Sequence, residues 1–177
     1  ALCIVTAHDP WLVVLAVIVC CVGAFAIAQM FGRAQVTSGV QRIGWLFLTA
    51  VGAGATIWCT HFVAMIAFKA GVPVTLDPVL TIGSLIVAIV GTGIGFGIAT
   101  WRHSLIHSIV GGALVGAAIA TMHFAGMAAY RVDGIVAWRG GYVLAAIICA
   151  VVFGAAALSA LGSEKLGRYR VATGSLL

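Results

Sequence analysis

The stretch GATIWCTHFVAMIAFK (residues 54–69) returns sixty-two residues later as GAAIATMHFAGMAAYR (residues 116–131). Each copy is apolar, and each carries a histidine followed four residues later by a methionine, at the same two positions. Residues four apart share one face of an α-helix, so each methionine is expected one turn from its histidine. The duplication predicts a fold built from copies of one helical unit.

The rest of the chain is equally apolar. Of its 177 residues, 63% are hydrophobic and only 7% are charged, with a mean hydropathy of +1.22. Soluble domains devote about a quarter of their residues to charge, so this composition indicates a membrane protein. Continuously apolar runs of roughly 20 residues cross a bilayer as helices, whereas a barrel needs short alternating segments. We expect five spanning helices, near Pro10–Met30, Ile43–Phe68, Pro78–Trp101, Ile106–Tyr130 and Gly141–Leu161.

The spans group into two-helix units. Asp9-Pro10 opens the first span and Asp77-Pro78 opens the third, and these residue types suit a helix N-cap and first turn. Each of these spans leads to a partner that carries the histidine and methionine. The fifth span would begin a third unit, with VATGSLL as the start of its partner. We therefore predict an all-α, polytopic transmembrane bundle of two-helix repeats with five helices and the start of a sixth. It forms one domain over residues 1–177, cut before a third histidine motif and without an output domain.

Basic residues set the expected orientation. Six lie in the odd-numbered loops, at Arg33, Arg42, Arg102, Lys165, Arg168 and Arg170, and three lie in the other loops, at Lys69, Arg131 and Arg139. This excess predicts cytoplasmic odd-numbered loops and an N-terminus outside. The formal charge of +5 is modest and forms no stripe, so nucleic acid is not an expected partner.

The repeated histidines stand at matched depth, about 10 Å inside the ends of their spans, and His8 reaches the same outer surface just before the first span. We predict a metal site formed by His8, His61, Met65, His123 and Met127. Imidazole suits several transition metals, while thioether favours Cu(I). No carboxylate of the kind zinc sites use lies near the repeated motifs, so copper is the expected ion. In the structural alternative, the histidines only bond a neighbouring helix and the methionines only fill gaps.

No catalytic pattern is present in the sequence. It lacks a buried serine with a base and an acid, a carboxylate pair within a span, and a phosphate-binding glycine loop. We do not expect this chain itself to be an enzyme.

The segments HDPW, WCTHFVAM and ATMHFAGMAAY resemble the MHYT domain, a bacterial integral-membrane sensor module named for a Met-His-Tyr-Thr motif. The likeness covers the whole chain. The second motif matches at Met122, His123, Gly126 and Met127, with Phe124 and Ala125 in place of tyrosine and threonine. The first motif keeps His61 and Met65 but has Thr60, Phe62 and Val63 where the family has Met, Tyr and Thr.

The resemblance implies a six- or seven-helix domain with three such motifs in the bacterial cytoplasmic (inner) membrane. It implies copper near the periplasmic face, through which O2, CO or NO is sensed. Such domains usually precede cytoplasmic output modules, often diguanylate cyclase or phosphodiesterase domains that turn over cyclic di-GMP. The partners that follow are the lipid bilayer, a diatomic gas, a linked or associated output domain and, as a further option, a second copy in a homodimer.

Three functional hypotheses stay open at this point. The leading one is a sensory input domain whose copper responds to a gas or to redox state. A haem-binding membrane redox protein would instead use His61 and His123 as axial ligands. A metal transporter would use the histidines as transient ligands, but the spans have almost none of the polar midplane residues that a transport path needs.

Overall fold

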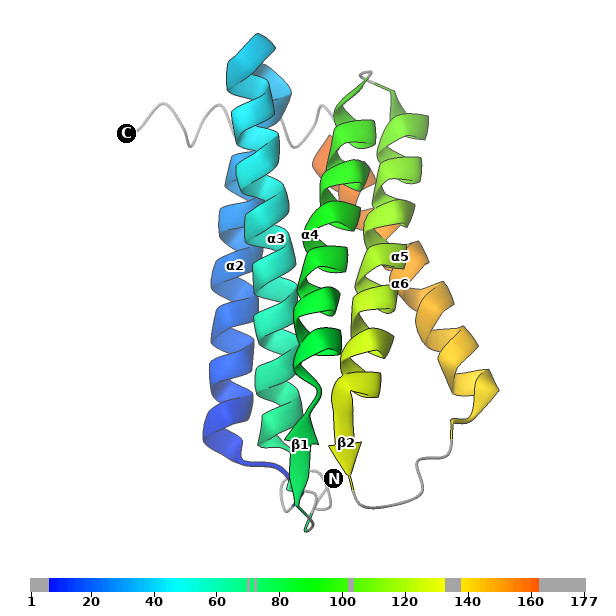
Figure 1. The fold of residues 1–177 in the computed structure, drawn as a ribbon. Helices are drawn as coiled ribbons and strands as arrows, with labels where there is room; N and C mark the ends of the chain where they lie inside the picture. The colour runs from blue at the N-terminus through cyan, green and yellow to red at the C-terminus, as the bar shows by residue number, and fades with distance from the viewer. Residues whose placement is uncertain (1–6, 70, 72, 102–103, 133–137, 163–177) are drawn as a thin grey trace.

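The computed structural model describes residues 7–69, 71, 73–101, 104–132 and 138–162 (Figure 1). Within these ranges, five helices are long and apolar enough to cross a membrane, which confirms the predicted helical bundle. The elements in chain order are α2 (Pro10–Val36), α3 (Gly39–Ala67), β1 (Val74–Leu76), α4 (Pro78–Trp101), α5 (Leu105–Ala129), β2 (Tyr130–Val132) and α6 (Gly140–Gly162).

The helix bounds differ from the predicted spans mainly at the connection between α2 and α3. Helix α2 continues six residues beyond Met30, and α3 begins four residues before Ile43. Hydropathy detects only the apolar part of a helix, whereas these two helices continue through more polar residues beyond that part. The two helices are joined by Thr37 and Ser38, and Gly39 has a φ of 59°, which glycine adopts without steric cost.

Backbone hydrogen bonds close each two-helix unit at one end of the bundle, which we call the strand end. In the first unit, Asp9 N–H donates to the Ala67 carbonyl at 2.8 Å, and His8 and Phe68 form an isolated antiparallel bridge. In the second, Asp77 N–H donates to the Ala129 carbonyl at 2.9 Å. Strands β1 and β2 extend that contact as an antiparallel pair (Figure 1). The two units therefore share one closing arrangement, although no strands were predicted.

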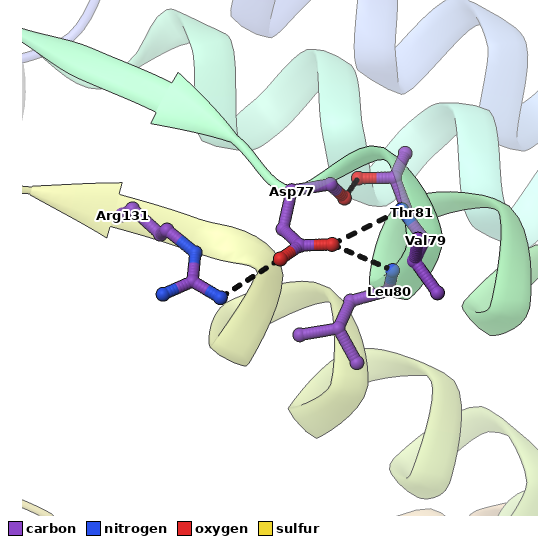
Figure 2. A network of polar contacts seen from close by, with 5 residues as sticks. All are labelled: Asp77, Val79, Leu80, Thr81 and Arg131. Carbon is purple, nitrogen blue, oxygen red and sulfur yellow. Dashed lines mark hydrogen bonds and ion pairs between the residues drawn. The ribbon is translucent and has the colours of Figure 1, made fainter.

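The aspartates that open the units cap their helices, as predicted. One carboxylate oxygen of Asp77 accepts hydrogen bonds from the N–H groups of Val79 and Leu80, at 3.0 and 3.1 Å (Figure 2). The other accepts from the Arg131 guanidinium at 2.8 Å. The bond from Arg131 holds the pKa of Asp77 below its ordinary value, and the backbone bonds act in the same direction. Helix α4 is thereby joined to the strand that follows α5.

Small residues bring the helices close together in the middle of the bundle. A Cβ at Gly112 of α5 would stand 2.7 Å from Cα of Ala155 on α6, and Gly116 meets the Ala150 carbonyl of α6.

The main hydrophobic cluster lies at the level of Phe31, Phe96 and other residues of α2, α3, α4, α5 and α6. At the end opposite the strands, Arg42 of α3 donates to the carbonyl of Thr100 on α4. Four of the basic residues on which the predicted membrane orientation rests lie outside the described residues: Arg102, Lys165, Arg168 and Arg170.

Candidate metal centre

His61 and His123 meet between α3 and α5. Each stands seven residues before the residue that caps the end of its helix, so the strand-end closure of the two units sets both side chains at one depth. Their Nδ1 atoms are 3.3 Å apart, and their ring centroids are 4.8 Å apart with an interplanar angle of 68°. The matched depth was predicted from the repeat, and the structure adds that the two imidazoles touch.

The close approach depends on a glycine three residues after His123. Gly126 is buried, and a Cβ there would lie 2.5 Å from Nε2 of His61. Aromatic rings hold the imidazoles from both sides. Phe62 packs edge-on to His61 at 5.3 Å, and Phe124 packs edge-on to His123 at 5.0 Å. Each imidazole is thus packed against the aromatic ring of the residue that follows it.

Both predicted methionines lie beside this pair. A mostly apolar cavity of about 350 Å³, which we call the histidine cavity, is lined by His61, Ala64, Met65, Phe68, His123, Met127 and Tyr130. Met122, in contrast, is only 1% exposed and belongs to the packed core. The structure thus brings four of the five predicted site residues around one cavity.

His8 lies at the same end of the bundle but in a different setting. Its ring stacks at a tilt on Phe68, with 5.3 Å between ring centroids, and its backbone bridges to that residue. Among the residues described, His8 does not line the histidine cavity, although Phe68, which it contacts, does. In the second unit the equivalent position, opposite Tyr130, is held by Leu76. The repeat therefore does not extend to a histidine at this position.

The geometry of the pair fits a shared metal ion. Imidazole nitrogen binds a metal such as zinc at about 2.0–2.1 Å, so two nitrogens on one tetrahedral ion stand about 3.3–3.4 Å apart. The measured Nδ1 separation is 3.3 Å. Within the described part of the chain, no group of three or more His, Cys, Asp or Glu side chains could hold a metal. The donor set at this cavity is therefore two imidazoles with two thioethers, a combination suited to copper and especially to Cu(I).

One nitrogen of His61 is unpaired whether the pair is structural or holds a metal through Nδ1. A hydrogen bond between the two Nδ1 atoms satisfies one nitrogen of each ring. The buried Nε2 of His61 has no hydrogen-bond partner among the described residues. Leaving a buried polar atom unpaired costs about 1–3 kcal/mol, and a metal held through the two Nδ1 atoms would leave this nitrogen unpaired as well.

Sequence reasoning missed three contributors to the site. Gly126 is essential to the ring contact, but its importance arises from the packing of α3 on α5, which one helix alone does not reveal. Phe68 and Tyr130 line the cavity as the caps of α3 and α5, because the backbone bridges turn each chain there. The available signal was the repeat itself, which places an aromatic residue seven positions after each histidine.

Comparison with known proteins places these features in a family. The model described as "MHYT: Bacterial signalling protein N terminal repeat" matches residues 54–112 and again 116–174. The first match runs from within α3 through α4 into α5, and the second begins within α5 and includes α6.

Relatives of known description are signalling proteins. An uncharacterized signaling protein of Caulobacter vibrioides is 34% identical over 175 residues, covering 99% of this chain and 22% of the relative. From Pseudomonas aeruginosa, the bifunctional diguanylate cyclase/cyclic di-GMP phosphodiesterase MucR is 30% identical over 154 residues, covering 82% and 22%. The cyclic di-GMP phosphodiesterase NbdA, also from that organism, is 30% identical over 167 residues, covering 92% and 21%. The chain thus spans about a fifth of the length of these relatives, and no solved structure matches it.

Proposed function

Because the chain belongs to the MHYT family of bacterial signalling proteins, we propose that it is a membrane-embedded sensory input domain that binds copper between α3 and α5. The observation that carries the proposal is the 3.3 Å separation of the Nδ1 atoms of His61 and His123. They face each other beside an apolar cavity that Met65 and Met127 also line.

The proposed stimulus is a diatomic gas (O2, CO or NO) or a change of redox state. Bound copper would supply a position for such a gas and a one-electron redox change. His61 and His123 would hold the ion through Nδ1, and Met65 and Met127 would add soft donors that favour the reduced ion. The mostly apolar lining of the histidine cavity suits a small uncharged ligand.

The proposed signal is a change in the position of α3 relative to α5. The two histidines belong to different helices and different units, so a ligand that prefers another Nδ1 separation favours another helix arrangement. We propose that a cytoplasmic module of the longer protein reads this arrangement by changing cyclic di-GMP turnover. The printed names of MucR and NbdA support that output, as does the small share of each relative that this chain covers.

The haem alternative conflicts with the ring geometry. Two axial histidines must leave space for a flat macrocycle between them. Here the ring nitrogens of His61 and His123 are in direct contact, so this pair would have to separate before it could hold a haem.

The transporter alternative lacks a polar path. The buried hydroxyls of Thr49, Thr92 and Thr100 donate to carbonyls of their own helices at 2.7–3.0 Å. These hydroxyls already donate to helix carbonyls and are therefore poorly placed to pass an ion along the bundle.

Orientation and domain organisation are part of the proposal. The charge count over the whole sequence supports an N-terminus outside, with the copper site near the periplasmic face of the bacterial inner membrane. We also propose that α6 begins a third two-helix unit, completed by a further histidine helix in the longer protein. The equivalence of the two closed units supports this repeat.

Metal analysis and an absorption spectrum of the purified protein test the proposed function. We expect copper in a fixed ratio to protein after reconstitution, without a Soret band. A Soret band that requires His61 and His123 would overturn the copper assignment in favour of haem. Protein that retains no copper after equilibrium dialysis would overturn it as well.

A further inference from the structure

A second cavity lies between α5 and the first turns of α6. These helices are in close contact where Gly112 and Gly116 of α5 meet α6, and they diverge toward the strand end (Figure 1). The divergence leaves a space of about 440 Å³, which we call the α5–α6 crevice. This volume lies within the range of small-molecule sites, which are mostly apolar with a few polar groups.

Three polar side chains line the crevice at two levels. His123 lies seven residues inside the end of α5, whereas Arg139 immediately precedes α6 and Tyr142 lies in its first turn. Each of these side chains can donate a hydrogen bond: an imidazole N–H, a guanidinium and a phenol. A ligand that satisfies them all must therefore carry acceptor atoms at both of its ends.

The walls of the crevice are aromatic. The rings of Phe124 and Trp138 meet edge-to-face with centroids 5.9 Å apart, and this contact joins α5 to the start of α6. The Tyr142 ring also lines the space, and Ala146 leaves room one turn deeper along α6. Flat aromatic walls favour a flat ring between them, through stacking or edge contacts.

We propose that the α5–α6 crevice binds a membrane quinone. A quinone has a flat ring with carbonyl acceptors on opposite sides and an apolar tail, which matches the donors and the walls of this space. Because α5 and α6 are membrane-spanning helices, a lipid-soluble ligand can reach the crevice from the bilayer. A phospholipid would suit Arg139 through its phosphate, but it has no flat ring to match the aromatic walls. His123 lines both cavities, so quinone occupancy is linked to the His61–His123 pair.

Quenching of the protein's tryptophan fluorescence by a bound quinone tests the quinone site. The protein is placed in phosphatidylcholine nanodiscs, stripped of metal, and titrated with the short-chain quinone ubiquinone-1. We expect saturable quenching that Ala146→Phe abolishes by filling the crevice. Tyr142→Phe and Arg139→Gln each remove a donor and should weaken binding about three- to tenfold.

Matched controls lie outside the crevice at the same end of the bundle. Tyr130→Phe removes a hydroxyl from the histidine cavity, and Lys69→Gln removes an exposed charge. Both should bind ubiquinone-1 like the unaltered protein. Because Tyr142→Phe changes a single hydroxyl, it remains informative if Ala146→Phe fails to fold.

Several outcomes would overturn the quinone proposal. Quenching that rises linearly and equally in the unaltered protein and Ala146→Phe would mean that the quinone only dissolves in the bilayer. Full exclusion of quinone by phosphatidylglycerol nanodiscs would assign the crevice to an anionic lipid. Binding that is lost in a longer chain would assign it to the segment after Leu177. Since the titration uses metal-free protein, its result is separate from that of the copper test.

Discussion

Gly126 of α5 lies directly against the imidazole of His61 on α3. A Cβ at this glycine would stand 2.5 Å from Nε2 and 2.9 Å from Cδ2 of that ring. The close contact between α3 and α5 at this point therefore requires a residue without a Cβ at position 126.

Gly126→Ala should displace the His61 ring and weaken copper binding. It should also lower the free energy of unfolding by about 1–3 kcal/mol, the usual cost of overpacking. Thermal unfolding in detergent and a copper titration measure the two effects. Gly83→Ala on α4 is the matched control, because no atom lies within 4 Å of the added Cβ. It should keep copper affinity and gain up to about 1 kcal/mol in stability. Equal copper affinity in the two variants would contradict this role of Gly126.

His61→Ala and His123→Ala should lose most bound copper, because each removes a primary ligand. We expect an affinity loss greater than the roughly 10–100-fold typical for an outer partner of a metal ligand. Titration with both oxidation states measures it. Full copper retention by either variant would remove that histidine from the site.

Met65→Leu and Met127→Leu nearly preserve apolar volume and should leave the fold intact. Loss of a thioether should weaken Cu(I) binding, leave Cu(II) binding in place and lower the Cu(II)/Cu(I) potential. Voltammetry and Cu(I) competition titrations check this. An unchanged Cu(I) affinity in both variants would show that the methionines serve only for packing.

Asp77→Asn should lower the stability of the folded protein at neutral pH, because it removes the ion pair with Arg131 while keeping a residue that caps helices well. The pKa of Asp77 is lowered by folding, so its stabilising effect is present above the unfolded pKa of about 3.9. It is lost as the pH falls through the lower folded value. Melting temperatures across pH 3–7 should therefore converge for the two proteins at the acid end. A difference that persists unchanged at pH 3 would contradict the ion-pair explanation.

Labelling with a membrane-impermeant thiol reagent tests the orientation. In a background without native cysteines, Lys69→Cys at the strand end should react in intact cells, whereas Ser38→Cys between α2 and α3 should react only after lysis. The reverse pattern would place the histidines near the cytoplasmic face.

The longer sequence tests the third unit. After Leu177 we expect about ten more apolar residues and then a histidine with a methionine four places later, as in the first two units. A polar continuation would contradict the repeat model.

The helices could be predicted because the bilayer requires long apolar runs, and these are visible in one dimension. Helix α4 has the predicted bounds, Pro78–Trp101, since aspartate and proline mark its start. The bounds of α2 and α3 were less accurate, because helix continues through polar residues outside the membrane. Strands β1 and β2 were missed because three-residue segments carry almost no pattern of their own and form by pairing across the chain.

For the candidate site, the sequence predicted the depth of the two histidines along their helices but not whether their side chains meet. The repeat placed His61 and His123 at one height, but the rotation of each helix about its axis decides whether two side chains meet. That rotation follows from contacts between helices, such as Gly126 against His61, which a single sequence does not encode locally. The setting of His8 depends likewise on a backbone bridge to a residue sixty positions away.

A tilt of α3 about its strand end would make this helix act as a lever. His61 stands about 10 Å from the tied end of α3, while the far end of this 29-residue helix is about 43 Å away. If the units rock about the tied end, a displacement of His61 relative to His123 is magnified roughly fourfold at the opposite end. The hydrogen bond from Arg42 to Thr100 joins α3 to α4 there, and it would be among the first contacts to strain. A movement too small to open the histidine cavity would thus still reach the other membrane surface as a displacement of several ångströms.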